Sequence, residues 1–218
     1  MKNLPNIDLR IPKELETATF AMGWFWGPDA QFGLIDGVVR TRVGYAGGTK
    51  ENPLYYDLGN HSETIQIDYD SRIVSYEELL NVFFRSHTPQ YKSPSRQYMS
   101  IIFYHSEKQK RSAYERRKKE EEEKKLKIYT EIIPFTKFYL AENYHQKYYL
   151  QLTKELMKEF SYVYKSFREF INSTSAAHVN GYIKGYGTIE RLSREKDDLG
   201  LSEDGINRLL DIVKGHGR

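Results

Sequence analysis

The residues best placed for chemistry follow an apolar run near the start of the chain, in the segment GWFWG at positions 23–27. Position 24 is expected at the end of a strand and just before a helix N-terminus, where the helix dipole favours a thiolate. The residue there is Trp24, whose indole has no ionisable sulfur and donates hydrogen bonds only. The chain contains no cysteine, which excludes a disulfide, a thiolate nucleophile and a cysteine-ligated metal site.

Five segments between residues 17 and 150 resemble, in order, the signatures of A-type peptide methionine sulfoxide reductases. They are GWFWG, VVRTRVGYAGG, NPLY, NHSE and AENYHQ, similar to the family's GCFWG, GVxxTxVGYAGG, NPTY, GHAE and AEDYHQ. One such match is weak, whereas five in the family's order are specific. The resemblance implies an α/β fold (an α+β roll): a two-layer mixed β-sheet with packed helices, a ferredoxin-like core and long C-terminal helices.

The resemblance implies a peptide-methionine (S)-S-oxide reductase that acts on oxidised methionine in proteins or peptides, or on the free amino acid. In that family a thiolate attacks the sulfoxide sulfur, an acid protonates the oxygen, and a sulfenic acid remains on the enzyme. An external thiol, from a thioredoxin-like protein or dithiothreitol, then restores the nucleophile. The resemblance thus implies no bound cofactor and no metal, and we expect a monomer.

Three polar residues correspond to the family's catalytic groups. Glu63 resembles the acid, and burial among aromatic side chains would raise its pKa enough for proton donation near neutral pH. Tyr55 and Tyr148 resemble the two tyrosines that hydrogen-bond the sulfoxide oxygen, because phenols can donate to developing negative charge. Taken singly, Glu63 could equally be a solvent-facing strand carboxylate, and either tyrosine could belong to the core of a chain with 18 tyrosines.

Phe25 and Trp26 resemble the aromatic walls that hold the substrate's methyl group. Asn143 stands where the family often has aspartate, so it keeps hydrogen bonding without the charge. His61 and His145 lie in the same motifs, and we assign them ordering roles only. The predicted substrate-binding residues are therefore Phe25, Trp26 and Asn143.

Trp24 occupies the family's position for the nucleophilic cysteine or selenocysteine, and three explanations stay open. Codon 24 is UGA, read naturally as selenocysteine but written as Trp; or Trp24 replaces a cysteine; or the chain is a natural pseudoenzyme. The intact acid, tyrosines and aromatic walls favour the first two. A true Trp at this position predicts an inactive protein, because an indole cannot attack sulfur and would fill part of the methyl pocket.

Two other classes of function compete with this interpretation. A binding module could recognise methionine sulfoxide or an apolar peptide in the aromatic site without catalysis. A nucleic-acid binder could use the basic segment 111–127, but its mixed charges at i,i+4 spacing are typical of a solvated helix. A net charge of only +3 also disfavours nucleic acid as a partner.

Hydrophobic periodicity predicts the elements that must position these residues. Strands are expected over 17–26, 38–45, 63–69, 98–104 and 128–135. Helices are expected over 28–35, 75–86, 106–127, 143–170 and 202–214, with the glycine-rich segment NGYIKGYGT starting at Asn180. Two of the strands are consecutive, so the sheet is expected to be mixed.

These patterns divide the chain into a polar leader (1–16), a reductase-like domain (17–189) and a C-terminal helical tail (190–218). No stretch approaches the ~20 apolar residues of a membrane span, and the first residues lack the apolar core of a signal peptide. We therefore expect a cytoplasmic protein without membrane or nucleic-acid partners.

Overall fold

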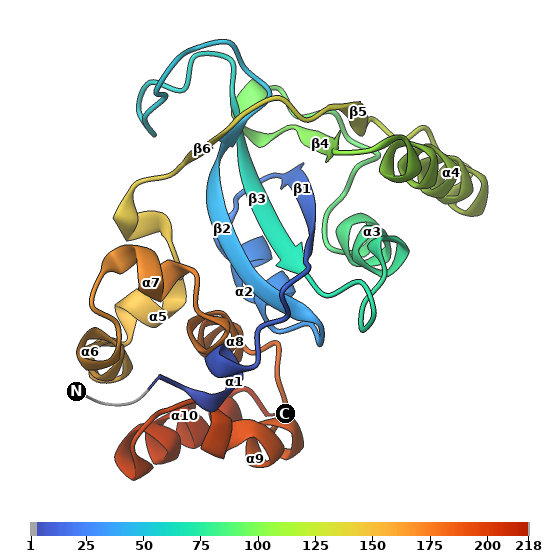
Figure 1. Ribbon diagram of the computed structural model, residues 1–218. Helices are drawn as coiled ribbons and strands as arrows, with labels where there is room; N and C mark the ends of the chain where they lie inside the picture. Colours follow the sequence, from blue (N-terminus) through green and yellow to red (C-terminus); the bar gives the residue numbers. More distant parts are fainter. Residues whose placement is uncertain (1–3, 218) are drawn as a thin grey trace.

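The computed structural model describes residues 4–217, and a six-stranded sheet lies at its centre (Figure 1). Its strands are β1 (Glu16–Met22), β2 (Val38–Ala46), β3 (Ser62–Tyr69), β4 (Ser100–Tyr104), β5 (Glu131–Pro134) and β6 (Phe138–Leu140). The order across the sheet is β5-β4-β1-β3-β2-β6. Strands β4 and β5 run parallel, whereas the other neighbouring pairs are antiparallel. The sheet is mixed, which confirms the predicted fold class.

Among the helices that pack against the sheet are α2 (Trp26–Gly33), α3 (Tyr76–Arg85) and α4 (Glu107–Lys124). Alternate residues of β1 enter the core that α3 covers, among them Ala18, Phe20 and Met22, as the two-residue period of a strand requires. Helix α3 begins with the predicted capping box. Ser75 Oγ accepts a hydrogen bond from Glu78 N at 3.2 Å, and the Glu78 carboxylate accepts one from Ser75 N at 2.8 Å.

The C-terminal helices gather beside α2 and the β2 side of the sheet (Figure 1). They are α5 (Tyr148–Leu152), α6 (Lys154–Val163), α7 (Phe167–Ile171), α8 (Thr174–Lys184), α9 (Ile189–Glu195) and α10 (Glu203–Gly215). Helix α8 lies directly against α2. A Cβ atom on Gly181 would stand 2.7 Å from the Ala30 carbonyl oxygen, so glycine allows the two backbones to approach.

The single long helix predicted over 143–170 is wrong. The segment instead forms a 3-10 turn (Asn143–His145), then α5, α6 and α7. Lys147 adopts a left-handed backbone (φ 47°, ψ 47°) between the 3-10 turn and α5. Ser166 has an extended backbone and is the N-cap residue at which α7 begins. The apolar periodicity across this segment belongs to several short helices that face one core.

Other boundaries also differ from the prediction. Strand β1 ends at Met22 rather than Trp26, because Gly23 turns the chain with φ +90°. The glycine-rich segment begins inside α8, and the chain leaves that helix at Gly185 with φ +88°. The short strand β6, which pairs with β2, and helix α1 (Asn6–Leu9) were not predicted.

Residues on both sides of the predicted division at 190 share one hydrophobic cluster. Leu156 and Phe160 of α6 belong to the same buried cluster as Leu209 and Val213 of α10. The boundaries drawn at 16 and 189 stay predictions. Within residues 4–217, no helix combines the length and the apolar character needed to cross a membrane.

Candidate active site

Position 24 lies at the surface, between the end of β1 and the start of α2. The Trp24 side chain is 63% exposed, and its ring lies 5.6 Å from that of Trp26, centroid to centroid. Because α2 begins at Trp26, a side chain at position 24 stands beside the positive end of the helix dipole, which stabilises an anion. The location therefore suits a nucleophile, although the indole there cannot act as one.

A buried carboxyl group binds the backbone of the residue that follows this position. Glu63 of β3 is only 2% exposed, and its Oε2 accepts a hydrogen bond from Phe25 N at 3.2 Å, one residue after position 24. Its Oε1 accepts a second bond from Gln97 Nε2 at 2.9 Å. Burial raises the pKa of Glu63 above its ordinary value, and the two hydrogen bonds oppose that rise only in part. The group is an acid that keeps its proton at higher pH than an exposed glutamate.

Several aromatic rings pack around Trp26, the first residue of α2. Tyr148, the first residue of α5, stacks on Trp26 with centroids 3.8 Å apart and planes 3° from parallel. Phe25 is buried against Tyr45 and His145, with centroids 6.1 and 5.0 Å away. The structure thus brings Trp26 and Tyr148 together, while the neighbouring Phe25 contacts Glu63 through its backbone N–H.

His145 orders this aromatic group. Its Nδ1 accepts a hydrogen bond from Trp26 Nε1 at 3.1 Å, and its ring lies 4.6 Å from that of Tyr55. Burial lowers the pKa of His145, so the imidazole is held neutral, with Nδ1 free to accept. The ring fixes the orientation of Trp26.

Tyr55 lies on the loop between β2 and β3 and joins the cluster through its contact with the His145 ring. Burial raises the pKa of Tyr55 to about 12, with contributions from a hydrogen bond to Tyr98 and from the negative charge of Glu63. The phenol therefore stays protonated and can donate a hydrogen bond. His61 holds the same loop, since its Nδ1 accepts from Gly48 N at 3.1 Å and its Nε2 lies 2.8 Å from the Lys50 carbonyl oxygen.

Two residues of the site, Glu142 and Gln97, were not predicted from the sequence. Glu142 accepts hydrogen bonds from the Tyr45 hydroxyl at 2.6 Å and from Tyr55 N at 2.8 Å, so it ties the loop to β2. Burial alone would raise the pKa of Glu142, but these hydrogen bonds bring it below its ordinary value. Gln97 holds the Glu63 carboxyl. Only Glu142 had a recognisable signal, because it follows Ala141 at the start of the AENYHQ motif.

Asn143 is placed differently from the other predicted residues. It is exposed and lines an open groove with Phe138, Phe167 and Arg168 rather than the aromatic cluster. Its predicted substrate-binding role stays a prediction. In the part of the chain that the structure describes, no group of three or more His, Asp or Glu side chains is placed to hold a metal ion.

Comparison with solved structures identifies the class of protein to which this fold belongs. The reduced form of Mxr1 from Saccharomyces cerevisiae superimposes with a TM-score of 0.60 at 28% identity, covering 66% of this chain and 89% of that one. Methionine sulfoxide reductase A of Corynebacterium diphtheriae gives a TM-score of 0.58 at 28% identity, covering 66% and 77%. The chain has the α/β fold of methionine sulfoxide reductases.

Sequence comparison then gives the family. Residues 16–178 match the family model described as peptide methionine sulfoxide reductase. A Drosophila melanogaster relative, named peptide methionine sulfoxide reductase, is 41% identical over 200 residues, which are 91% of this chain and 79% of the relative. A Methanosarcina acetivorans relative, peptide methionine sulfoxide reductase MsrA, is 46% identical over 147 residues, covering 62% and 78%. The chain belongs to the peptide methionine sulfoxide reductase family, whose members are oxidoreductases.

A second match concerns the C-terminal helices. Residues 168–214 match the model described as the helical domain of selenoprotein methionine sulfoxide reductase A. This region begins within α7 and continues through α8 and α9 into α10. The helical layer is thus similar to one found in selenoproteins of the same family.

Proposed function

We propose that this chain is a peptide-methionine (S)-S-oxide reductase whose catalytic form carries selenocysteine at position 24, from a UGA codon written here as Trp. The observation that carries the proposal is the buried Glu63 carboxyl bonded to Phe25 N beside that position. Two features of the chain support selenium: the absence of any cysteine, and the match of 168–214 to the selenoprotein helical domain.

The proposed reaction places each group according to its chemistry. The selenolate at position 24 attacks the sulfoxide sulfur, while Glu63 donates its proton to the sulfoxide oxygen. The phenols of Tyr55 and Tyr148 donate hydrogen bonds to that oxygen as it gains negative charge, and Phe25 with Trp26 holds the methyl group. The S–O bond and the new Se–S bond then break as the protonated oxygen passes to selenium, which becomes a selenenic acid, and the sulfur keeps an electron pair, so that methionine leaves reduced.

An external reductant closes the proposed cycle. Two thiols reduce the selenenic acid to the selenol, and they form one disulfide and one water molecule. The chain has no cysteine to resolve the intermediate itself. We therefore propose a thioredoxin-like protein as the physiological reductant, and dithiothreitol as its substitute in assays. A cytoplasmic monomer without nucleic-acid partners remains our prediction from the sequence.

The first test replaces Trp24. With dithiothreitol as reductant, we expect no activity from the Trp24 protein and stereospecific reduction of methionine S-sulfoxide by Trp24→Cys. The matched control is Trp24→Ser, which has nearly the size of cysteine but no sulfur and should be inactive. A folded Trp24→Cys protein that reduces neither sulfoxide epimer would overturn the proposed site.

The codon decides the identity of the native nucleophile. We expect UGA at position 24 and a selenocysteine insertion element in the message. A UGG codon without such an element would rule out selenocysteine and leave a replaced cysteine or a pseudoenzyme.

The alternative is a module that binds methionine sulfoxide without reducing it, and the exposed Trp24 indole beside Trp26 favours it. Calorimetry with a methionine sulfoxide peptide and the Trp24 protein separates the two functions. Saturable binding, together with an inactive Trp24→Cys protein, would support the binding module.

A further inference from the structure

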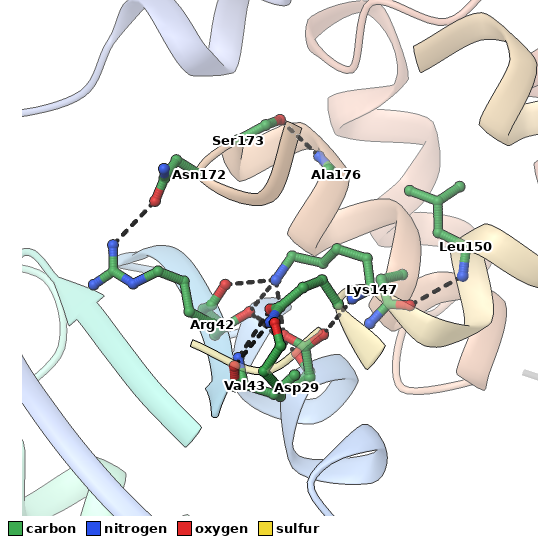
Figure 2. A network of polar contacts seen from close by, with 12 residues as sticks. Asp29, Arg42, Val43, Lys147, Leu150, Asn172, Ser173 and Ala176 are labelled. Atoms are coloured by element: carbon green, nitrogen blue, oxygen red, sulfur yellow. Dashed lines mark hydrogen bonds and ion pairs between the residues drawn. The ribbon is translucent and has the colours of Figure 1, made fainter. Parts of the chain in front are cut away.

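A completely buried ion pair joins α2 to the turn before α5. Lys147 and Asp29 both have 0% exposed side chains, and Lys147 Nζ lies 2.8 Å from Asp29 Oδ1. Nζ also donates to the Thr41 carbonyl oxygen at 2.6 Å and to Thr41 Oγ1 at 2.9 Å. An ammonium group has three donors and no acceptor, so these three oxygens satisfy it completely (Figure 2). Lys147 therefore has no free proton or lone pair for catalysis.

The same pair fixes the backbone of residue 147. The Lys147 backbone N–H donates to Asp29 Oδ2 at 2.9 Å, so one carboxylate receives both the amide and the ammonium. Lys147 has the left-handed backbone that side chains with a Cβ rarely adopt (φ 47°, ψ 47°). Such a conformation persists only where surrounding contacts impose it, and here Asp29 and Thr41 impose it.

Both partners stand next to residues of the candidate active site. Tyr148 directly follows Lys147, and Trp26 lies one helical turn before Asp29 on α2. These neighbours form the parallel stack whose centroids are 3.8 Å apart. The ion pair thus links the backbone segments that carry Trp26 and Tyr148, whose rings stack on each other at the site.

The residue before Lys147 ties the same turn to the sheet. Gln146 Oε1 accepts from Val43 N at 3.0 Å, and its Nε2 donates to Val43 O at 2.8 Å. The amide side chain extends the hydrogen-bonding edge of β2, so the turn cannot slide along the strand. Lys147 supplies the remaining link, toward α2.

We propose that Lys147 and Asp29 are positioning residues, whose buried ion pair sets the left-handed turn that places the Tyr148 phenol over Trp26. The proposal rests on the proposed reductase function. Buried ion pairs can often be replaced by apolar residues without loss of stability, which makes stability alone a weak reason for this one. Its partners adjoin Trp26 and Tyr148, the stacked residues that the proposed reaction assigns to the substrate, and this gives the pair a geometric role.

The test uses the Trp24→Cys protein, in which Trp26 is the only one of the chain's two tryptophans that remains. The neutral pair Lys147→Met with Asp29→Asn removes both charges and keeps an amide oxygen for the backbone N–H of residue 147. We expect a folded protein by circular dichroism, a kcat for methionine S-sulfoxide at least tenfold lower, a KM changed less than threefold, and altered Trp26 fluorescence. Transition-state contacts affect kcat more than KM.

A double-mutant cycle with Tyr148→Phe separates positioning from general stability. If the ion pair acts through the phenol, the neutral pair should lower kcat less than twofold once the phenol is gone. Equal losses with and without the phenol, or unchanged kcat and fluorescence, would overturn the proposal. The matched control neutralises the Arg116–Glu120 ion pair, one of several on α4, with Arg116→Met and Glu120→Gln, which should leave kcat unchanged.

Failure of the proposed function gives a different result. The Trp24→Cys parent with native Lys147 and Asp29 would then be inactive, whereas Trp26 fluorescence would still report whether the ion pair holds the stack. Unchanged fluorescence in the neutral pair would overturn the positioning role even in that case.

Discussion

Glu63 meets two opposing requirements, because its carboxyl is buried for proton donation and yet lies beside a helix start that favours anions. Burial raises its pKa, so in the Trp24→Cys protein we expect kcat to fall as pH rises through that pKa and the donor proton is lost. Glu63→Gln should lower kcat by about 10²- to 10⁴-fold, the usual contribution of a general acid, and should remove this alkaline limb. A kcat profile over a range of pH that spans neutrality measures both effects.

Gln97 provides the control for the alkaline limb. Its hydrogen bond favours the charged form of Glu63, so Gln97→Leu should move the limb to higher pH.

The pH dependence of folding stability independently checks the direction in which the pKa of Glu63 is shifted. Because the folded state holds the Glu63 proton more tightly than the unfolded state, Glu63 costs stability as pH rises through its folded pKa. Glu63→Gln should therefore be relatively more stable above that pKa than below it, and a limb that persists in Glu63→Gln would assign it to another group.

Helices α2 and α8 pack closely enough that a single methyl group matters. A Cβ on Gly181 would lie 2.7 Å from both the Ala30 carbonyl oxygen and Leu34 Cβ. We expect Gly181→Ala to lower the free energy of unfolding by about 1–3 kcal/mol through overpacking, although alanine is the better helix former. Urea unfolding at constant m-value measures the change.

The control for this contact is another helical glycine. Gly215, at the end of α10, has open space around the position that a Cβ would take, with nothing within 4 Å. Gly215→Ala should be neutral or stabilising, by up to about 1 kcal/mol. Equal stability of the two alanine variants would show that the backbones of α2 and α8 separate without cost.

Local patterns predicted most elements but not the breaks between them. Ser75 and Glu78 are three residues apart, so their capping box could be recognised directly in the sequence. The left-handed turn at Lys147 could not, because its partner Asp29 is 118 positions away. Glu63 and the aromatic residues were predicted only through the resemblance of the short motifs around them to those of the family, because spacing alone assigned them no role. Gln97 was missed because only the folded chain brings it to Glu63.

In the whole molecule, the last two helices, α9 and α10, belong to the same buried cluster as α5, α6 and α8. Leu209 of α10 is completely buried there. Leu209→Ala should lower the free energy of unfolding by about 2–5 kcal/mol. In the Trp24→Cys background it should leave kcat unchanged below the melting temperature, since the residues assigned to the candidate site all lie outside α10.

The cooperativity of thermal unfolding tests whether α9 and α10 unfold together with the rest of the protein. We expect thermal unfolding followed by circular dichroism and by Trp26 fluorescence to coincide in Leu209→Ala, because the cluster reaches α8 and through it α2. Leu152→Ala is the matched control, since that leucine is 62% exposed and its truncation should cost little. An early transition seen only by circular dichroism would show that α9 and α10 unfold separately.

The exposed setting of position 24, in a chain without cysteine, has a kinetic consequence for the proposed reductase. The oxygen taken from one methionine has no cysteine thiol on the protein to which the oxidation can pass. It must wait on residue 24 until a reducing partner arrives at that same exposed atom. Oxidised methionine and reductant must therefore bind alternately at residue 24. The supply of reductant then limits how many oxidised methionine side chains each enzyme molecule can repair.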